Sequence, residues 1–295
     1  MIIRNFLDFI MKGRIQALLV AILAMFVPFF GWVTSVTIGL VTLRVGLIEG
    51  MNLVLWTGLP NVVLAWRGEP TALYINVLAG TLLTWILAAV LRLSRSWRKV
   101  LLTAMIIGVA AVGLFHLFIP DVQAWWLGKL ELGLKQASES GLLAIPIPTA
   151  LEAVKPVTVY ISGILTAGLL LMAISNVLIA RWGQALLYNP GGLKKELYQL
   201  HLTRISAFSI IILAAILFSN GPLGWDSLPV LILPLALMGM IVIHVLLAKS
   251  THAVLLLGGF YGLLILLLQH VAVVLALVAL LDSVIDFRNR LKRVE

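Results

Sequence analysis

The sequence predicts an all-α protein, a polytopic transmembrane helical bundle that forms a single integral membrane domain over residues 1–295. Three observations support this class. Hydrophobic residues make up 62% of the chain and charged residues only 11%, whereas a soluble domain carries about 25% charged residues. The mean hydropathy is +1.11. Residues 254–281 contain no charged side chain, and about 20 such residues are enough for a helix to cross a bilayer.

Apolar stretches suitable for membrane helices follow one another along the whole chain. Pro28, Gly31, Gly39 and Gly46 also permit a re-entrant element near 28–48, because broken helices are tolerated in a membrane where they line protein or a cavity. We therefore expect about ten membrane segments, or about eight with re-entrant elements. The candidate segments lie near 15–31, 33–48, 50–66, 71–91, 100–118, 157–180, 205–219, 228–248, 252–268 and 270–285.

Basic residues are concentrated in short segments between these stretches. The chain has 21 Lys and Arg against 12 Asp and Glu, a net charge of +9, and short loops rich in Lys and Arg usually face the cytoplasm. Nucleic acid is not expected as a partner, because no basic surface domain is present to bind it. Four segments are expected to be cytoplasmic: an amphipathic lead-in at 1–14, the loop at 92–99, the loop at 181–204 and the basic tail at 286–295.

The connection at 119–156 differs from those loops, because it has no excess of basic residues. Its first part, 121–140, has apolar residues at helical spacing and includes Trp125 and Trp126, which favour the membrane interface. We expect an amphipathic helix on the periplasmic surface over this part. The second part contains the stiff sequence IPIP at 145–148, and an ordinary periplasmic loop is an equally good interpretation there.

Polar residues within apolar segments are candidates for a ligand site, because burying them in hydrocarbon is costly. The predicted ligand-binding residues are Arg44, Glu49, Asn52, Trp56 and Asn61. A buried Arg44–Glu49 pair would suit an anionic or zwitterionic ligand, with the asparagines as hydrogen-bonding groups and Trp56 as a stacking wall. The alternatives are that Arg44 extends to the cytoplasmic interface and that the asparagines pair helices.

A short amphipathic segment in the 181–204 loop is a candidate contact for a protein partner. Asn189-Pro-Gly-Gly precedes it, and its apolar side chains recur at helical spacing. Such a stripe can dock a partner or lie on lipid, and both interpretations remain open. The predicted partner-binding residues are Leu193, Leu197, Tyr198 and Leu200.

Enzyme and metal chemistry are not predicted. The sequence lacks the HExxH, GxSxG, P-loop and GxGxxG signatures, so we expect no catalytic residues, no cofactor and no enzymatic activity. There is no cysteine, and the membrane histidines are not at metal-ligand spacing, so no metal site is expected. The membrane histidines are His116, His244, His252 and His270. For His244 hydrogen bonding between helices is the simpler role, and proton relay is the alternative.

Small and polar residues in the later segments predict helix packing. Gly258 and Gly262 have the spacing that allows two helices to approach closely, and Asn176 is expected to pair its helix with a neighbour. Asp282 and Asp286 are four residues apart and share one helical face. They would either couple protons or cations, or neutralise the bases of the tail.

Four stretches together resemble the YybS-like predicted membrane-protein family of bacteria. They are LRVG at 43–46, NPGGLKKELYQLHLTR at 189–204, GMIVIH at 239–244 and LLDSVIDFRNRL at 280–291. That family looks distantly similar to the substrate-binding S components of energy-coupling-factor transporters. The resemblance implies a bacterial inner membrane, a small-molecule pocket near the outer face and a cytoplasmic side that docks a transport module. This chain is longer than an S component, around 119–156 and in its C-terminal helices.

These observations favour a small-molecule-binding or transport subunit that resembles S components. The alternative is a non-enzymatic scaffold or interaction protein in cell-envelope assembly. Both hypotheses place the protein in the inner membrane with its N-terminus and C-terminus in the cytoplasm. They differ in where function resides, because the first uses polar groups inside the bilayer and the second uses the 181–204 loop.

Overall fold

The computed structural model describes residues 2–27, 29–66, 71–142 and 144–287, with the side chains of 61, 64, 65 and 71–77 excepted. The described residues form α-helices and one 3-10 helix, with no strand among them. The predicted all-α membrane bundle is therefore confirmed. Most of the tail expected at 286–295 lies outside the described residues.

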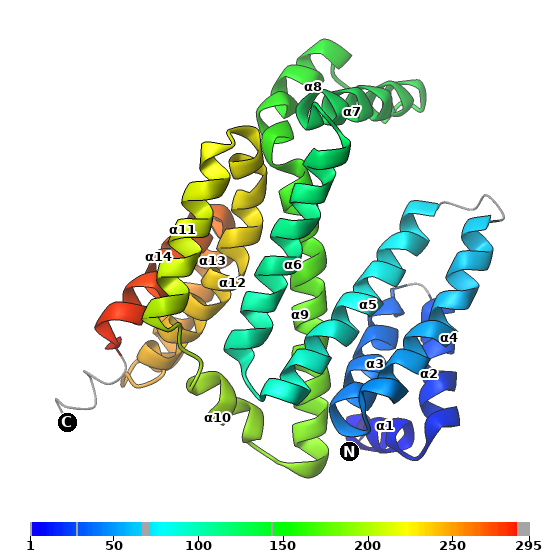
Figure 1. Cartoon of the computed structure of the whole chain (residues 1–295), viewed down its shortest axis with the longest axis vertical. Helices are drawn as coiled ribbons and strands as arrows, with labels where there is room; N and C mark the ends of the chain where they lie inside the picture. The colour runs from blue at the N-terminus through cyan, green and yellow to red at the C-terminus, as the bar shows by residue number, and fades with distance from the viewer. Residues whose placement is uncertain (1, 28, 67–70, 143, 288–295) are drawn as a thin grey trace.

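The N-terminal half builds one side of the bundle (Figure 1). Its first two helices meet at an angle of 118°, so the first lies across the end of the bundle and the second enters it. The amphipathic first helix buries Leu7 and Ile10 against the rest of the protein. The helices are α1 (Ile2–Met11), α2 (Arg14–Phe26), α3 (Gly31–Arg44), α4 (Leu47–Trp66) and α5 (Thr71–Ser94).

Helices α2 and α3 form a short hairpin rather than two membrane crossings. They contain 13 and 14 residues, which gives each a length of about 20 Å at 1.5 Å per residue, less than the ~30 Å hydrocarbon core. In Figure 1 the end of α2 and the start of α3 lie below the level at which α4 ends and α5 begins. The hairpin thus has the dimensions of a re-entrant element, and it starts earlier in the sequence than the expected 28–48.

The C-terminal half contributes the longer helices and a cap at the end of the bundle away from the N-terminus. Helices α7 and α8 lie across that end, the short helix α10 lies at the other end, and the longer helices run between them (Figure 1). The elements are α6 (Trp97–Phe118), α7 (Val122–Glu139), α8 (Ile147–Val154), η1 (Lys155–Tyr160), α9 (Ile161–Tyr188), α10 (Gly192–Tyr198), α11 (Arg204–Ser219), α12 (Pro222–Leu247), α13 (Ala253–Leu266) and α14 (Leu268–Ile285).

Fewer helices meet the length and composition of a membrane span than the eight to ten segments expected. Among the described residues four do so: α6, the continuous stretch Ile147–Tyr188, α12 and α14. The bent α1–α2 pair has the composition of a fifth only if its two helices are taken as one broken span rather than as part of a re-entrant element. Shorter apolar helices account for part of the difference: Leu78–Ser94, α11 and α13. Hydropathy counts every apolar run, whereas the break at Leu267 divides one long run into α14, which is long enough to span, and α13, which is too short. The chain is a multi-pass membrane protein.

Helix α3 occupies the centre of the N-terminal half, and all of its residues from Thr34 to Leu43 are buried. It packs against α2, α4, α5 and α9. Two of its threonines donate to backbone carbonyls: Thr42 Oγ1 to Ile38 of the same helix and Thr34 Oγ1 to Ala21 of α2, each at 2.7 Å. Close packing depends on Gly50 of α4, because a Cβ there would lie 1.9 Å from Thr42 Oγ1. The result is a tightly packed polar-apolar core without charge.

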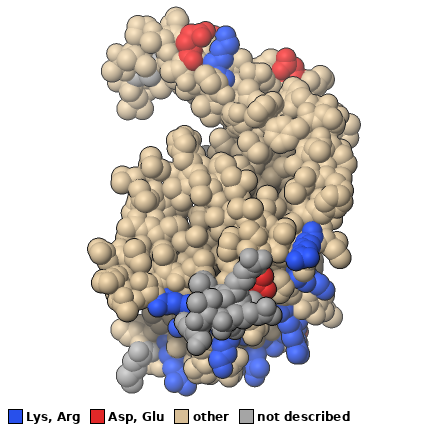
Figure 2. All heavy atoms as spheres, turned by 90° about the vertical axis from the view of Figure 1, so that its left-hand side faces the viewer, with Lys and Arg blue, Asp and Glu red and all other residues tan. Residues whose placement is uncertain are grey.

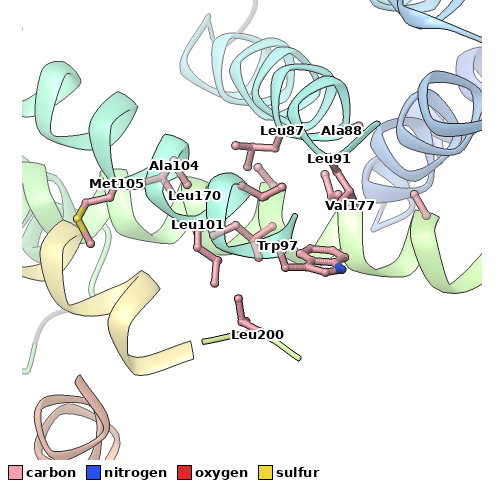
Figure 3. Packing of buried hydrophobic residues seen from close by; sticks show 14 of the residues in the cluster. Leu87, Ala88, Leu91, Trp97, Leu101, Ala104, Met105, Leu170, Val177 and Leu200 are labelled. Carbon is pink, nitrogen blue, oxygen red and sulfur yellow. The ribbon is translucent and has the colours of Figure 1, made fainter. Parts of the chain in front are cut away.

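A second core layer joins the two halves (Figure 3). The α6 side chains of Trp97 and Leu101 lie beside α5 and α9, that of Met105 points toward α12, and Leu200 approaches the same layer from the segment after α10 (Figure 3). Asn176 of α9 is buried, and its Nδ2 lies 3.5 Å from Thr84 Oγ1 of α5. The expectation that Asn176 pairs two helices is thereby confirmed.

Close helix crossing occurs at a different glycine from the pair that the sequence suggested. A Cβ at Gly258 or Gly262 would meet no atom within 4 Å, so within this chain these two positions are not packing sites. At Gly239 of α12 a Cβ would lie 1.9 Å from the carbonyl oxygen of Leu275 in α14. The prediction was wrong because small-residue spacing does not reveal which helix face meets a neighbour, and α13 has no buried residue.

Charged side chains separate the two ends of the bundle. Figure 2 shows Lys and Arg gathered at the lower end, a band without charge above them, and both acids and bases at the upper end. We call the lower end, which carries Arg14, Arg44, Arg92 and Arg181, the basic end. The other end, which carries α7 and α8, is called the opposite end.

Candidate functional site

The predicted Arg44–Glu49 pair does not form. Glu49, in the first turn of α4, pairs with Arg14 at the start of α2, with 2.6 Å between Arg14 Nη2 and Glu49 Oε1. The sharp α1–α2 bend brings Arg14 to this position. Arg44 extends from the last turn of α3 toward α9, where its guanidinium carbon lies 4.1 Å from the centre of the Tyr188 ring. The expected pairing was wrong because Arg44 and Glu49 lie on different helices, separated by the break after α3.

Three of the five predicted ligand-binding residues line one cavity at the basic end. Glu49, Asn52 and Trp56 are placed at successive turns of α4, and they face a cavity of about 450 Å³ that α1 and α2 close on the other side. Arg14 also lines this cavity, which we call the α1–α4 cavity. Arg44 does not line it, and the side chain of Asn61 is not among those described. The volume is in the range of small-molecule sites.

The lining of the α1–α4 cavity combines one ion pair with apolar walls. The apolar part comes from α1, α2, α3 and α4, for example Ile10, Leu18 and Leu53. The Glu49 side chain is only 19% exposed, whereas that of Arg14 is 83% exposed. Trp56 is 57% exposed, so its ring forms a wall that also borders the membrane. This arrangement suits a molecule with a polar or zwitterionic head and an apolar body.

The predicted partner stripe is divided between the protein core and a second cavity. Leu200 is buried in the core described above, so it cannot contact a partner in this conformation. Leu193, Leu197 and Tyr198 of α10 line a groove of about 600 Å³ between α9, α10, α12 and α13. We call this the α10 groove. Part of the amphipathic face of α10 thus covers its own bundle, which spacing along one helix cannot reveal.

Two of the histidines make contacts between helices. In the α10 groove, His244 Nδ1 of α12 lies 2.8 Å from the hydroxyl oxygen of Tyr261 in α13. At the opposite end, His116 Nε2 of α6 lies 2.9 Å from Asp226 Oδ2 of α12. The contact of His244 confirms the expectation that this histidine pairs two helices, and the His116 contact is an additional one that the sequence did not predict.

Asp226 is a buried charge that the sequence analysis missed. Its side chain is 2% exposed, and its second carboxylate oxygen accepts a hydrogen bond from the backbone N–H of Gly163 at 2.8 Å. A Cβ at Gly163 would lie 1.7 Å from the carbonyl oxygen of Asp226, so only glycine allows this contact. The available signal was a single acid at the start of an otherwise uncharged segment.

The surroundings of the His116–Asp226 pair are closed and aromatic. Phe115 packs against Trp125 and Trp126, and the indole N–H of Trp126 donates to Ser162 Oγ at 2.9 Å. Helices α6, α7, α9 and α12 therefore meet near a pair in which both carboxylate oxygens of Asp226 have a partner within the protein. This arrangement favours a structural role.

Comparison with known proteins adds no constraint on the site: no protein-family model, no curated protein and no solved structure matches this chain.

Proposed function

We propose that the protein is a small-molecule-binding membrane subunit that takes an amphiphilic molecule into the α1–α4 cavity. The observation that carries this proposal is the convergence of the Arg14–Glu49 ion pair, Asn52 and Trp56 on one cavity with otherwise apolar walls. The ion pair offers both a cation and an anion, which suits a zwitterionic or polar head. The apolar walls and Trp56 suit the body of the molecule.

We further propose that the basic end faces the cytoplasm, because segments rich in Lys and Arg are retained there. The α1–α4 cavity then lies at the level of the inner leaflet, and the partly exposed Trp56 borders the route from the lipid. This departs from the resemblance to S components, which implies a pocket near the outer face. The proposal therefore retains small-molecule binding and assigns the ligand to the membrane phase.

Native mass spectrometry of the protein extracted from its own membranes tests this function. We expect a bound small molecule on the unmodified protein and its loss in Glu49→Gln and Trp56→Ala. Trp66→Ala is the matched control, because Trp66 lies on the same helix, is 91% exposed and does not line the cavity. Retention of the same adduct in Trp56→Ala and Trp66→Ala would contradict the assignment.

A second function, docking of a membrane or cytoplasmic protein partner, is favoured by the α10 groove. Leu193, Leu197 and Tyr198 line this groove together with Trp182 and Tyr261, and aromatic side chains are common at interfaces. A photoreactive residue in place of Tyr198 would then crosslink to a protein in native membranes. The same residue in place of Phe208, exposed on α11 and outside the groove, should give lipid adducts. Lipid adducts alone at both positions would contradict partner docking.

A further inference from the structure

A second cavity at the basic end is lined mainly by arginine. It has a volume of about 530 Å³ and lies where α3, α5, α9 and α10 end or begin. Arg44, Arg92, Arg95 and Arg181 line it, and Glu196 is the single acid among its lining residues. We call it the arginine pocket. It shares no lining residue with the α1–α4 cavity.

Two of these arginines are fixed by the protein itself. Arg92 Nη1 donates to the carbonyl oxygens of Thr42 and Leu43, at 3.2 and 2.6 Å, and thereby caps the end of α3. Arg181 forms a two-point ion pair with Glu196, with its Nε 3.1 Å from Oε2. The Trp97 indole N–H donates to the same Glu196 oxygen at 3.2 Å. These contacts hold Arg92 and Arg181 in place at the rim of the pocket. The charge of Glu196, the one acid among the lining residues, is compensated by Arg181.

The other two arginines keep their hydrogen-bond donors available. Among the described residues, neither the Arg44 nor the Arg95 guanidinium donates a hydrogen bond to another protein group, although the backbone N–H of Arg95 donates to the Leu91 carbonyl at 2.8 Å. Arg44 is held through its face, by stacking on Tyr188, which leaves the N–H groups at the edge of its guanidinium free to meet a ligand. Arg95 lies in the short turn between α5 and α6 with φ of 51°, an uncommon backbone conformation for a non-glycine residue.

Charge and geometry together indicate the chemistry of the ligand. Four guanidinium groups face one carboxylate that is already paired, so the pocket has a positive excess. A planar guanidinium presents paired N–H donors that match the oxygens of a phosphate. Basic pockets between membrane helices at the cytoplasmic level also suit lipid headgroups. A general positive-inside signal requires only bases near the surface, whereas here they converge on one cavity.

We propose that the arginine pocket is a phosphate-binding site in which Arg44 and Arg95 contact the phosphate and Arg92 and Arg181 supply a fixed positive field. The ligand is a phosphate ester, carried by an anionic phospholipid or by a soluble compound. This site is independent of the amphiphile site and can exist whether or not the α1–α4 cavity is occupied.

Binding measurements on the full chain with two probes test the site and separate its two sources. In one arm, protein in phosphatidylcholine nanodiscs is titrated with inorganic pyrophosphate. In the other, native mass spectrometry in detergent measures the affinity for phosphatidic acid against phosphatidylcholine. We expect Arg44→Gln and Arg95→Gln each to weaken binding about tenfold, because each removes a charge-assisted contact. Both leave the α3 cap and the Arg181–Glu196 pair intact.

Lys99→Gln is the matched control, since it removes the same charge close to Arg95 but outside the pocket. The affinity of Lys99→Gln for each probe should stay within about twofold of that of the unmodified protein. If Arg44→Gln and Arg95→Gln each lower the affinity for pyrophosphate about tenfold, the phosphate comes from a soluble compound. If they lower only the affinity for phosphatidic acid, it comes from a lipid headgroup. Equal losses in Lys99→Gln and Arg95→Gln, or binding of neither probe above the phosphatidylcholine background, would overturn the proposal.

Discussion

The two ends of the bundle both contain charged groups close to the membrane, but they use them differently. At the opposite end, one acid and one histidine meet in a closed contact, and the second oxygen of Asp226 is satisfied by a backbone N–H. At the basic end the arginines outnumber the acids that pair with them, and the α1–α4 cavity and the arginine pocket are lined by arginines together with Glu49 or Glu196.

This difference distinguishes polar groups that hold helices together from those that remain available to a ligand. A buried charge whose bonds are all internal stabilises one arrangement of helices, and removing one partner leaves the other uncompensated. A charged side chain that lines a cavity and has donors without a protein acceptor can instead form hydrogen bonds to a ligand. Mutation should therefore reduce stability where the bonds of a charged group are internal, as at Asp226, and reduce ligand affinity where a charged group lines a cavity with its donors available, as at Arg44.

The largest effect on stability is expected at Asp226. Asp226→Leu leaves His116 and the Gly163 N–H without their acceptor in a buried position, and the free energy of unfolding should fall by about 3–5 kcal/mol. Unfolding by SDS titration in mixed micelles measures this change. Asp226→Asn retains an acceptor oxygen and should lose less. If both variants unfold like the unmodified protein, the closed contact is not a structural element.

The next largest effect is expected where α12 crosses α14. Gly239→Ala places a methyl group 1.9 Å from the carbonyl oxygen of Leu275, a backbone atom that cannot move without its helix. A loss of about 3 kcal/mol is expected in the same titration, at the upper end for overpacking. Gly258→Ala, which meets open space, should instead be neutral or stabilising by up to about 1 kcal/mol. Equal losses in both would contradict the assigned crossing.

A smaller effect is expected at the basic end when Arg92 is replaced. Arg92→Gln removes the cap on the carbonyl oxygens of Thr42 and Leu43, and about 2 kcal/mol should be lost, since buried acceptors lose their partner. Thermal unfolding in detergent, with Lys99→Gln as the matched charge control, measures this. A melting temperature equal to that of the control would show that α3 does not depend on its cap.

The smallest effect is expected on the surface of α7. Glu131 and Lys135 form an exposed ion pair at 2.8 Å, one helical turn apart. Glu131→Gln should cost only about 0.3–0.5 kcal/mol, and added salt should mask the difference in melting temperature. A loss comparable to that of Asp226→Leu would remove the distinction between surface pairs and the closed contact.

The sequence predicted the residues on one side of the α1–α4 cavity but not those on the other. Glu49, Asn52 and Trp56 could be identified because they follow helical spacing within one apolar segment. Arg14 could not, since it reaches Glu49 only through the 118° bend between α1 and α2. Arg44 was assigned to the wrong cavity for the same reason, as its contact with Tyr188 joins residues far apart in the chain.

By itself the sequence determined the membrane class, the all-α fold and the separation of charge, because hydropathy and charge act along the chain and at its loops. The tertiary structure decided which breaks produce short helices, which glycine allows a close crossing, and which charges are paired. Those outcomes depend on contacts between distant segments, such as Asp226 with His116 and Arg92 with the end of α3. Local periodicity carries no information on the partner that a helix face will meet.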